Sequence, residues 1–192
     1  MKKTNLKKAM MTVLVAVIAM ANATPLMAQQ DVRVVVKRVD NEAPKKIEVA
    51  DNYLVGTWVM EYYQFEGEGN TKNICGTNYS QVKVYRANGE YACAEITKFN
   101  DGSVQVYPHE YGTYTFKNGR YSEMGRPEVE ADGFVVVDKN TFKGRWKNRH
   151  DSWKRASLPD KLVDYIVAQC KAKQEGAPKD IQQLIKTHIF NK

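Results

Sequence analysis

The sequence predicts a mainly β protein, an antiparallel up-and-down β-barrel of about eight to ten strands followed by two C-terminal α-helices. Three observations lead to this fold class. Short runs rich in β-branched and aromatic residues alternate with period two from residue 53 to residue 157. Turn-forming dipeptides separate these runs. After Leu158 the apolar residues take the spacing of an amphipathic helix instead.

The first 28 residues have the layout of a signal peptide. Four lysines and no acid precede an apolar run from Ala9 to Ala21, which is shorter than the roughly 20 residues that span a bilayer. Small residues permit cleavage after Ala23 or Ala28, and we favour Ala28. We therefore expect an exported protein, periplasmic or secreted, with a retained N-terminal anchor as the alternative.

Charge argues against a nucleic-acid partner. The 192-residue chain has 29 Lys+Arg and 22 Asp+Glu, a formal net charge of +7, and loss of the four signal-peptide lysines leaves +3. Such an excess is too weak to indicate nucleic acid. After signal removal no run is long enough for an integral membrane span. The sequence identifies no protein partner.

The mature chain divides into three parts. Residues 29–49 are polar and charged apart from Val32–Val36, so we expect a flexible lead-in with at most one short strand. The barrel is expected over residues 50–157. A helical extension packed on the barrel is expected over residues 158–192.

Tight hairpins connect the expected strands. Asn-Gly and Asp-Gly accept positive φ at low cost and are strong hairpin signals. Four dipeptides separate the β-rich runs: Asn88-Gly89, Asp101-Gly102, Asn118-Gly119 and Lys139-Asn140. Many consecutive hairpins favour closure into a barrel, since an open sheet would leave long pairing edges exposed.

Two apolar stripes predict the C-terminal helices. Pro159 lies at a first helical position, Gly176 ends the first helix, and Pro178 precedes the second. The stripes are Leu162, Val163, Ile166, Val167 and Cys170, and then Ile181, Leu184, Ile185, His188 and Ile189. We expect them to pack on the barrel wall or one barrel mouth, with a partner chain as the alternative.

The chain has three cysteines, Cys75, Cys93 and Cys170. Export permits disulfides, and a bridge between Cys75 and Cys93 is the most natural pairing. The alternative is three free thiols, two of them buried as small hydrophobes. No Cys-x-x-Cys motif or Cys/His cluster indicates a metal, and we expect no cofactor.

No catalytic motif accompanies the titratable residues. The pair His109-Glu110 lacks a third metal ligand, and the pair His150-Asp151 lacks a nucleophile motif such as Gly-x-Ser-x-Gly. We therefore name no catalytic residue and do not expect an enzyme.

The segment Gly56-Thr57-Trp58, at the start of the first long strand, resembles the Gly-x-Trp element of the lipocalin and fatty-acid-binding (calycin) β-barrels. The resemblance implies that Trp58 plugs the closed end of the barrel. It also implies that Arg155, from the last strand, packs across the indole and completes closure together with Gly56. The chain looks most like the secreted lipocalin-like domains of unknown function found in Bacteroidetes.

A lipocalin-like barrel implies a ligand in its interior. If Trp58 points inward, period two predicts these lining residues: Trp58, Met60, Tyr62, Val82, Val84, Tyr114, Phe116, Phe142 and Trp146. Such a lining suits a small hydrophobic or aromatic molecule. The alternatives are that these side chains pack a solid core, and that the protein is an interaction or inhibitor module with functional loops such as residues 67–78.

Overall fold

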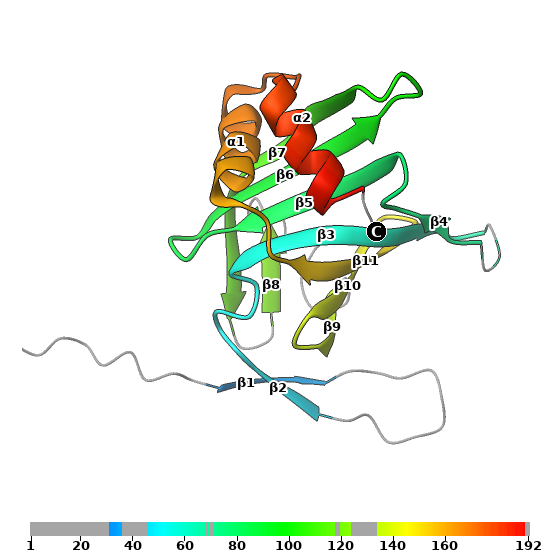
Figure 1. The fold of residues 1–192 in the computed structure, drawn as a ribbon. Coiled ribbons are helices and arrows are strands. Elements are labelled where there is room, and N and C mark those ends of the chain that lie inside the picture. Colours follow the sequence, from blue (N-terminus) through cyan, green and yellow to red (C-terminus); the bar gives the residue numbers. More distant parts are fainter. Residues whose placement is uncertain are drawn as a thin grey trace, which may run out of the picture.

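The computed structural model describes residues 31–35, 46–67, 69, 71–117, 120–123 and 134–190. One nine-stranded antiparallel sheet runs in the order β8-β7-β6-β5-β3-β11-β10-β9, with the short β4 beside β3 (Figure 1). Its strands are β3 (Gly56–Phe65), β4 (Asn73–Ile74), β5 (Tyr79–Tyr85), β6 (Glu90–Lys98), β7 (Val104–Lys117), β8 (Arg120–Glu123), β9 (Phe134–Asp138), β10 (Thr141–Trp146) and β11 (Arg149–Ala156).

The sheet curls into a nearly closed barrel. The first long strand, β3, pairs with the last strand, β11, over eight residues of β11 from Arg149 to Ala156. The two end strands approach each other through aromatic side chains, because Phe134 of β9 lies 5.0 Å from Tyr121 of β8 and 5.5 Å from Phe116 of β7, between ring centroids. The predicted antiparallel barrel is therefore confirmed.

Most of the expected hairpin turns lie where the sequence places them. The dipeptides at 88–89, 101–102 and 139–140 join consecutive paired strands, while Asn118-Gly119 lies outside the described residues. β7 continues through Pro108 as a single strand. The register shifts there, with Cys93 opposite Glu110 and Ala94 opposite Pro108. A bulge at this point accommodates a proline that has no N–H for the ladder.

A separate two-stranded ribbon precedes the barrel. β1 (Asp31–Val35) and β2 (Lys46–Ala50) pair antiparallel, with Val32 opposite Val49. The lead-in therefore holds two strands, where the sequence suggested at most one. Alternating apolar residues in both segments explain the pairing.

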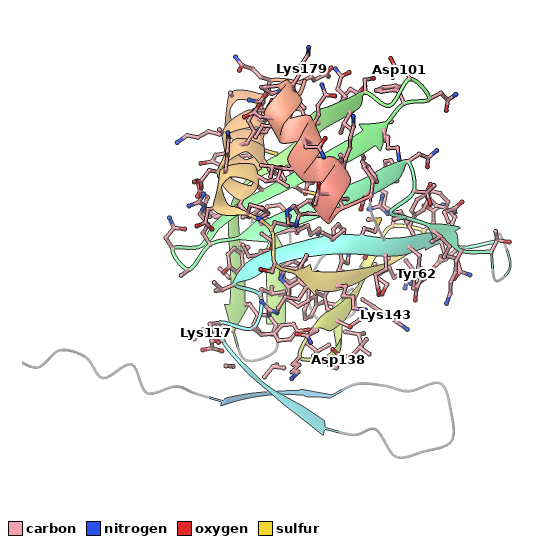
Figure 2. All side chains as sticks on the ribbon, viewed as in Figure 1. Tyr62, Asp101, Lys117, Asp138, Lys143 and Lys179 are labelled. Carbon is pink, nitrogen blue, oxygen red and sulfur yellow. The ribbon has the colours of Figure 1, made fainter. Side chains whose placement is uncertain are left out.

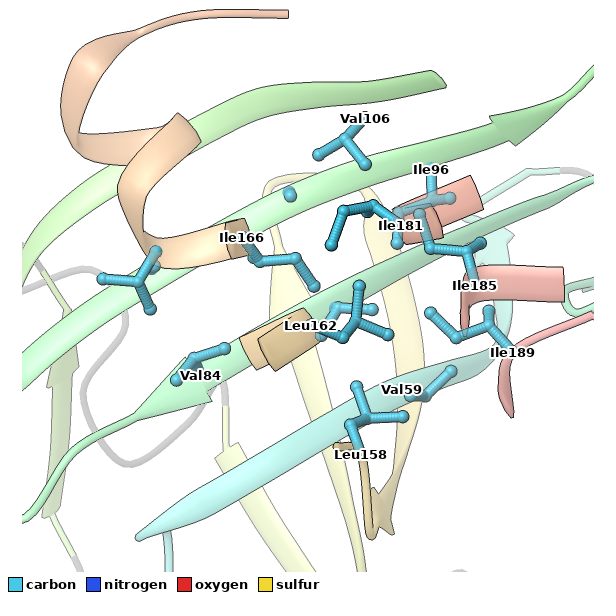
Figure 3. Packing of buried hydrophobic residues seen from close by; sticks show 14 of the residues in the cluster. Val59, Val84, Ile96, Val106, Leu158, Leu162, Ile166, Ile181, Ile185 and Ile189 are labelled. Carbon is cyan, nitrogen blue, oxygen red and sulfur yellow. The ribbon is translucent and has the colours of Figure 1, made fainter. Parts of the chain in front are cut away.

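The two C-terminal helices cover the outside of one barrel wall, as expected. α1 (Asp160–Ala172) and α2 (Lys179–His188) lie across the outer face of the sheet over β5, β6 and β7 (Figures 1 and 3). Leu162, Ile166, Ile181 and Ile185 are buried against sheet residues that include Val59, Val82, Val84, Ile96 and Val106. No helix in the described ranges is long and apolar enough to span a bilayer.

The barrel interior holds a second, largely aromatic cluster, and Figure 2 shows side chains filling the space that the sheet encloses. Its buried members include Trp58, Met60, Tyr85, Tyr91, Phe116, Phe142 and Trp153. The wall formed by β3, β5 and β6 thus has buried apolar side chains on both faces. The cluster inside the barrel is largely aromatic, and the cluster beneath the helices is largely aliphatic.

Candidate functional site

One end of the barrel is sealed by Trp58 and Arg155. These residues are register partners, and the guanidinium carbon of Arg155 lies 4.3 Å from the indole centroid. Arg155 also donates hydrogen bonds to the backbone oxygens of Val55, at 2.7 Å, and Tyr53. The indole Nε1 of Trp58 donates to the carbonyl of Leu54 at 2.8 Å. This end is closed by a stacked cation and its hydrogen bonds.

Gly56 belongs to this closure. Its φ is +126°, and a Cβ there would lie 2.9 Å from Nη1 of Arg155. A side chain at this position would therefore strain the backbone and displace the guanidinium. The glycine two residues before Trp58 is explained by the close approach of the arginine.

Five of the nine expected lining residues face the interior. Trp58, Met60, Phe116 and Phe142 are buried in the interior cluster, and the partly buried Tyr114 packs against it. They touch other aromatic rings, and Trp58 meets Phe142 edge-on at 4.8 Å. The structure thus brings these residues together as packing partners. Their role toward a ligand stays a prediction.

Val82 and Val84 do not line the interior, contrary to expectation. Both are buried on the outer face beneath the helices, so their neighbours Lys83 and Tyr85 point inward. Both faces of β5 are buried, so its apolar residues do not reveal which face is the interior. The valines lie on the outer face because they pack there against the aliphatic stripe of α1.

The expectation for Tyr62 is also wrong, because β3 contains an irregularity. Trp153 pairs with Met60 while the preceding Ser152 pairs with Tyr62, so the register shifts by one residue. Beyond this bulge Tyr63 packs against the interior cluster instead. The ammonium nitrogen of Lys72 lies 4.4 Å from the ring centroid of Tyr62. The side chain of Trp146 lies outside the described residues.

All three cysteines are free thiols. Cys93 is buried in the interior cluster, Cys170 of α1 is buried between that helix and the sheet, and Cys75 is half-buried. The predicted Cys75–Cys93 bridge is absent and the alternative of three thiols holds. Burial raises the pKa of both Cys75 and Cys170 to about 11, which keeps these thiols protonated and unreactive.

A charged cluster lies among the aromatic rings of the interior. The ammonium of Lys83 contacts Oε1 of Glu123 at 2.7 Å. The same oxygen accepts hydrogen bonds from the hydroxyls of Tyr85, at 3.1 Å, and Tyr121. The ammonium also lies 4.9 Å from the ring centroid of Trp153. An ion pair in this setting is desolvated, and therefore a costly element of a barrel core.

The pair stays ionised at neutral pH. Burial lowers the pKa of Lys83, but the charges of Glu123 and Asp151 and the hydrogen bond to Glu123 act together against it and raise the pKa above its ordinary 10.5. Burial favours the neutral acid of Glu123, yet Lys83 and the hydrogen bond from Tyr121 hold its pKa below 4.5. Burial raises the pKa of Tyr85 and Tyr121 well above 10.0, so both hydroxyls remain donors.

A small cavity of about 60 Å³ adjoins this cluster. Asp151 borders it, accepting a hydrogen bond from Trp153 Nε1 at 2.7 Å and lying 3.4 Å from Nη2 of Arg149. Gly144 faces Asp151 in the register, and a Cβ there would lie 2.3 Å from the carboxylate. Other lining residues are Gln81, Tyr91, Cys93, His109, Glu110, Phe134, Phe142 and Arg145.

A wider groove of about 980 Å³ lies outside the barrel at the sealed end, between the β5–β6 turn, the ends of β3 and β11, and the start of α1. Arg86, on its wall, is already paired with Asp164 at 2.6 Å and with Glu90 at 3.1 Å. Arg155 and Thr57, also on its wall, hold the barrel together. Each site has one buried nitrogen without a hydrogen bond among the described residues, Nε of Arg86 in the groove and Nε of Arg149 in the cavity.

No family model and no curated protein matches the chain. The barrel has its first and last long strands paired, with an arginine stacked on the tryptophan of a Gly-x-Trp element. The fold is lipocalin-like. Among solved structures the chain is similar to a lipocalin-like protein from Bacteroides uniformis, with 16% identity, a TM-score of 0.33, and coverage of 54% of this chain and 98% of that one.

The charged cavity residues were not among the candidates from the sequence. Lys83 and Arg149 line the cavity because of which face of each strand points inward. On β5 the alternation of period two alone assigned the wrong face to the interior. Asp151 was considered only as a partner of His150, but the two point apart, since His150 contacts Glu66 at 3.0 Å outside the barrel. One signal in the sequence could have located Lys83. The apolar stripes of α1 and α2 must pack on an aliphatic sheet face, which places Val82 and Val84 outside and Lys83 inside the barrel.

Proposed function

We propose that this protein binds a small polar molecule in the cavity beside Lys83 and Asp151, inside the lipocalin-like barrel. The observation that supports this most is the buried pair of Lys83 and Glu123. Replacing such a pair by apolar side chains usually leaves stability unchanged or improves it, so folding alone does not require it. Shifted titratable groups beside a cavity are typical of functional sites.

The lining does not favour the hydrophobic ligand suggested by the resemblance. Aromatic side chains fill most of the interior, and the remaining cavity of about 60 Å³ is well below the 300–1,000 Å³ of ordinary ligand pockets. The side chains of Lys83, Asp151 and Arg149 border it. A molecule of a few non-hydrogen atoms that exchanges hydrogen bonds with these groups fits better.

A titration with a panel of small polar compounds, monitored by two-dimensional NMR, tests this proposal. We expect saturable shifts confined to cavity residues such as Trp153. Cys93→Met should abolish them, because the added atoms occupy the cavity. Cys75→Met is the matched control, since Cys75 lies outside the lining. A panel that shifts no cavity resonance would contradict the proposal.

The nearly filled interior supports a second candidate, a protein-interaction module. Ile74 of β4, in the connection between β3 and β5, is 69% exposed, the most exposed large hydrophobic side chain of the described residues. Exposed apolar side chains on a rigid scaffold suit partner recognition. Two results together would support this candidate. The NMR panel shifts no cavity resonance, and Ile74→Asp abolishes a partner interaction while leaving the free energy of unfolding unchanged.

Export remains a proposal based on residues 1–28, which lie outside the described residues. A cleaved signal peptide would place the protein in the periplasm or the medium. N-terminal sequencing of the mature protein tests this, with Gln29 expected as the first residue.

A further inference from the structure

The cavity has more hydrogen-bond donors than its own acceptors use. Lys83 has three ammonium hydrogens, and among the described residues only Glu123 accepts from it. The Nε–H of Arg149 is buried and has no hydrogen-bond partner in the described structure. Buried donors without partners are rare in folded proteins and need an explanation.

Acceptors beside these donors are already engaged. One oxygen of Asp151 accepts from Trp153, and the other faces Nη2 of Arg149 at 3.4 Å. Oε1 of Glu123 accepts from three donors, and Glu110 accepts from the hydroxyl of Tyr91 at 3.1 Å. The Nε–H of Arg149 is thus left without an acceptor, and an oxygen placed beside it could also accept from the ammonium of Lys83.

Resting on the proposed function, we propose that the ligand is a small oxyanion, a carboxylate or nitrate-sized group, whose oxygens accept from Lys83 and Arg149. A planar oxyanion matches the donors of a guanidinium. The cavity of about 60 Å³ takes such an ion whole and leaves no room for a long chain behind it.

The carboxylates of the cavity oppose this anion and set its affinity. Three cations line the cavity and each already faces one acid: Lys83 faces Glu123, Arg149 faces Asp151, and Arg145 faces Glu66 outside the lining. Glu110 adds a further acid on the wall. We therefore expect weak binding in the wild-type protein. Glu110→Gln removes the opposing charge with little change of shape, and should tighten binding about tenfold.

The test is an NMR titration of the full chain at constant ionic strength with acetate, nitrate and the neutral acetamide, following the Nε–H of Arg149 and the indole N–H of Trp153. We expect saturable shifts with the anions and none with acetamide. The acetate and nitrate arms separate a carboxylate ligand from an inorganic ion. Arg149→Gln should weaken binding about tenfold, the loss of one charge-assisted hydrogen bond.

Two further variants keep the test decisive. Lys83→Met should also abolish binding, and Arg149→Gln, at a partly exposed position, covers the case in which Lys83→Met fails to fold. Lys143→Met, on the exposed side of β10, is the matched control and should leave binding unchanged. Cavity shifts with acetamide but not with anions would overturn this inference and leave the proposed function standing. No saturable cavity shift with any compound would overturn both.

Discussion

The guanidinium carbon of Arg155 lies 4.3 Å from the indole centroid of Trp58, which joins the last strand of the barrel to the first. We expect Arg155→Ala to lower the free energy of unfolding by about 2–3 kcal/mol, from the lost cation–π contact and the lost bonds to the carbonyls of Val55 and Tyr53. Urea denaturation measures this. Lys154→Ala, at the exposed neighbouring position, should cost less than about 0.5 kcal/mol. Equal losses in the two variants would contradict the assigned role of Arg155.

The bulge in β3 turns the side chain of Tyr63, and not that of Tyr62, toward the interior cluster. Tyr63 lies 5.7 Å from Phe65 and 6.0 Å from Tyr79, between ring centroids. We expect Tyr63→Ala to lower stability by about 2 kcal/mol and Tyr62→Ala by less than about 1 kcal/mol. Thermal unfolding of both variants compares them directly. The reverse order would show that period two continues through β3.

Gly144 leaves room for the carboxylate of Asp151. Because a Cβ would lie 2.3 Å from that carboxylate, Gly144→Ala should displace Asp151 and lower stability by about 2 kcal/mol. In an Asp151→Ala background the same substitution should cost much less. A double-mutant cycle in urea measures the coupling. Additive effects would rule out this contact as the cause.

The interior tyrosines and Lys83 predict a loss of stability in alkali. Burial raises the pKa of Tyr85, Tyr91 and Tyr121 above 10.0, so these hydroxyls ionise first in the unfolded chain. The raised pKa of Lys83 acts in the same direction: its stabilisation is complete below pH 10.5 and is lost as the pH rises through the folded value. The share of the tyrosinate absorbance that comes from these three rings should therefore appear only with unfolding, above pH 10. Tyrosinate absorbance that reaches its full value for all 11 tyrosines before unfolding would show that these rings are accessible.

At acid pH the free energy of unfolding should change in the opposite direction, falling as the pH is lowered. The pKa of Glu123 is held below 4.5 in the folded protein, so its stabilisation is present above pH 4.5 and is lost as the pH falls through the folded value. The double substitution Lys83→Met with Glu123→Leu should flatten this pH dependence. Denaturation midpoints from pH 3 to pH 7 compare the two proteins.

The three thiols should react only slowly with thiol reagents while the protein is folded. Cys93 and Cys170 are buried, and Cys75 is half-buried with a pKa of about 11. We expect slow reaction with a thiol reagent in buffer, reaction of all three after denaturation, and an unchanged Tm in dithiothreitol. A Tm that falls on reduction would indicate the Cys75–Cys93 bridge.

Local signals predicted the fold well. The turn dipeptides, the period of two and the later helical stripes place the strands and helices where the structure has them. Gly56, Trp58 and Arg155 were found through the resemblance to the calycin barrels, which implies an arginine from the last strand packed on the tryptophan of the Gly-x-Trp element.

The interior was harder to predict, for two physical reasons. Strands such as β5 are buried on both faces, so hydropathy does not distinguish the inner Tyr85 from the outer Val84. Bulges in β3 and β7 then reverse the phase part-way along a strand, as Tyr63 shows. A sequence pattern carries neither the bulges nor the packing that places Lys83 inside.

The helices brace only one side of the molecule. The backbone amides of β5 and β6 are enclosed between two layers of side chains, so they should exchange with solvent on the timescale of global unfolding. Neither helix of the described residues covers β9 or β10, and β9 ends the sheet (Figure 1). Opening fluctuations should therefore concentrate at that margin, which Phe134 shares with the charged cavity, and would admit a small solute without disturbing the braced half.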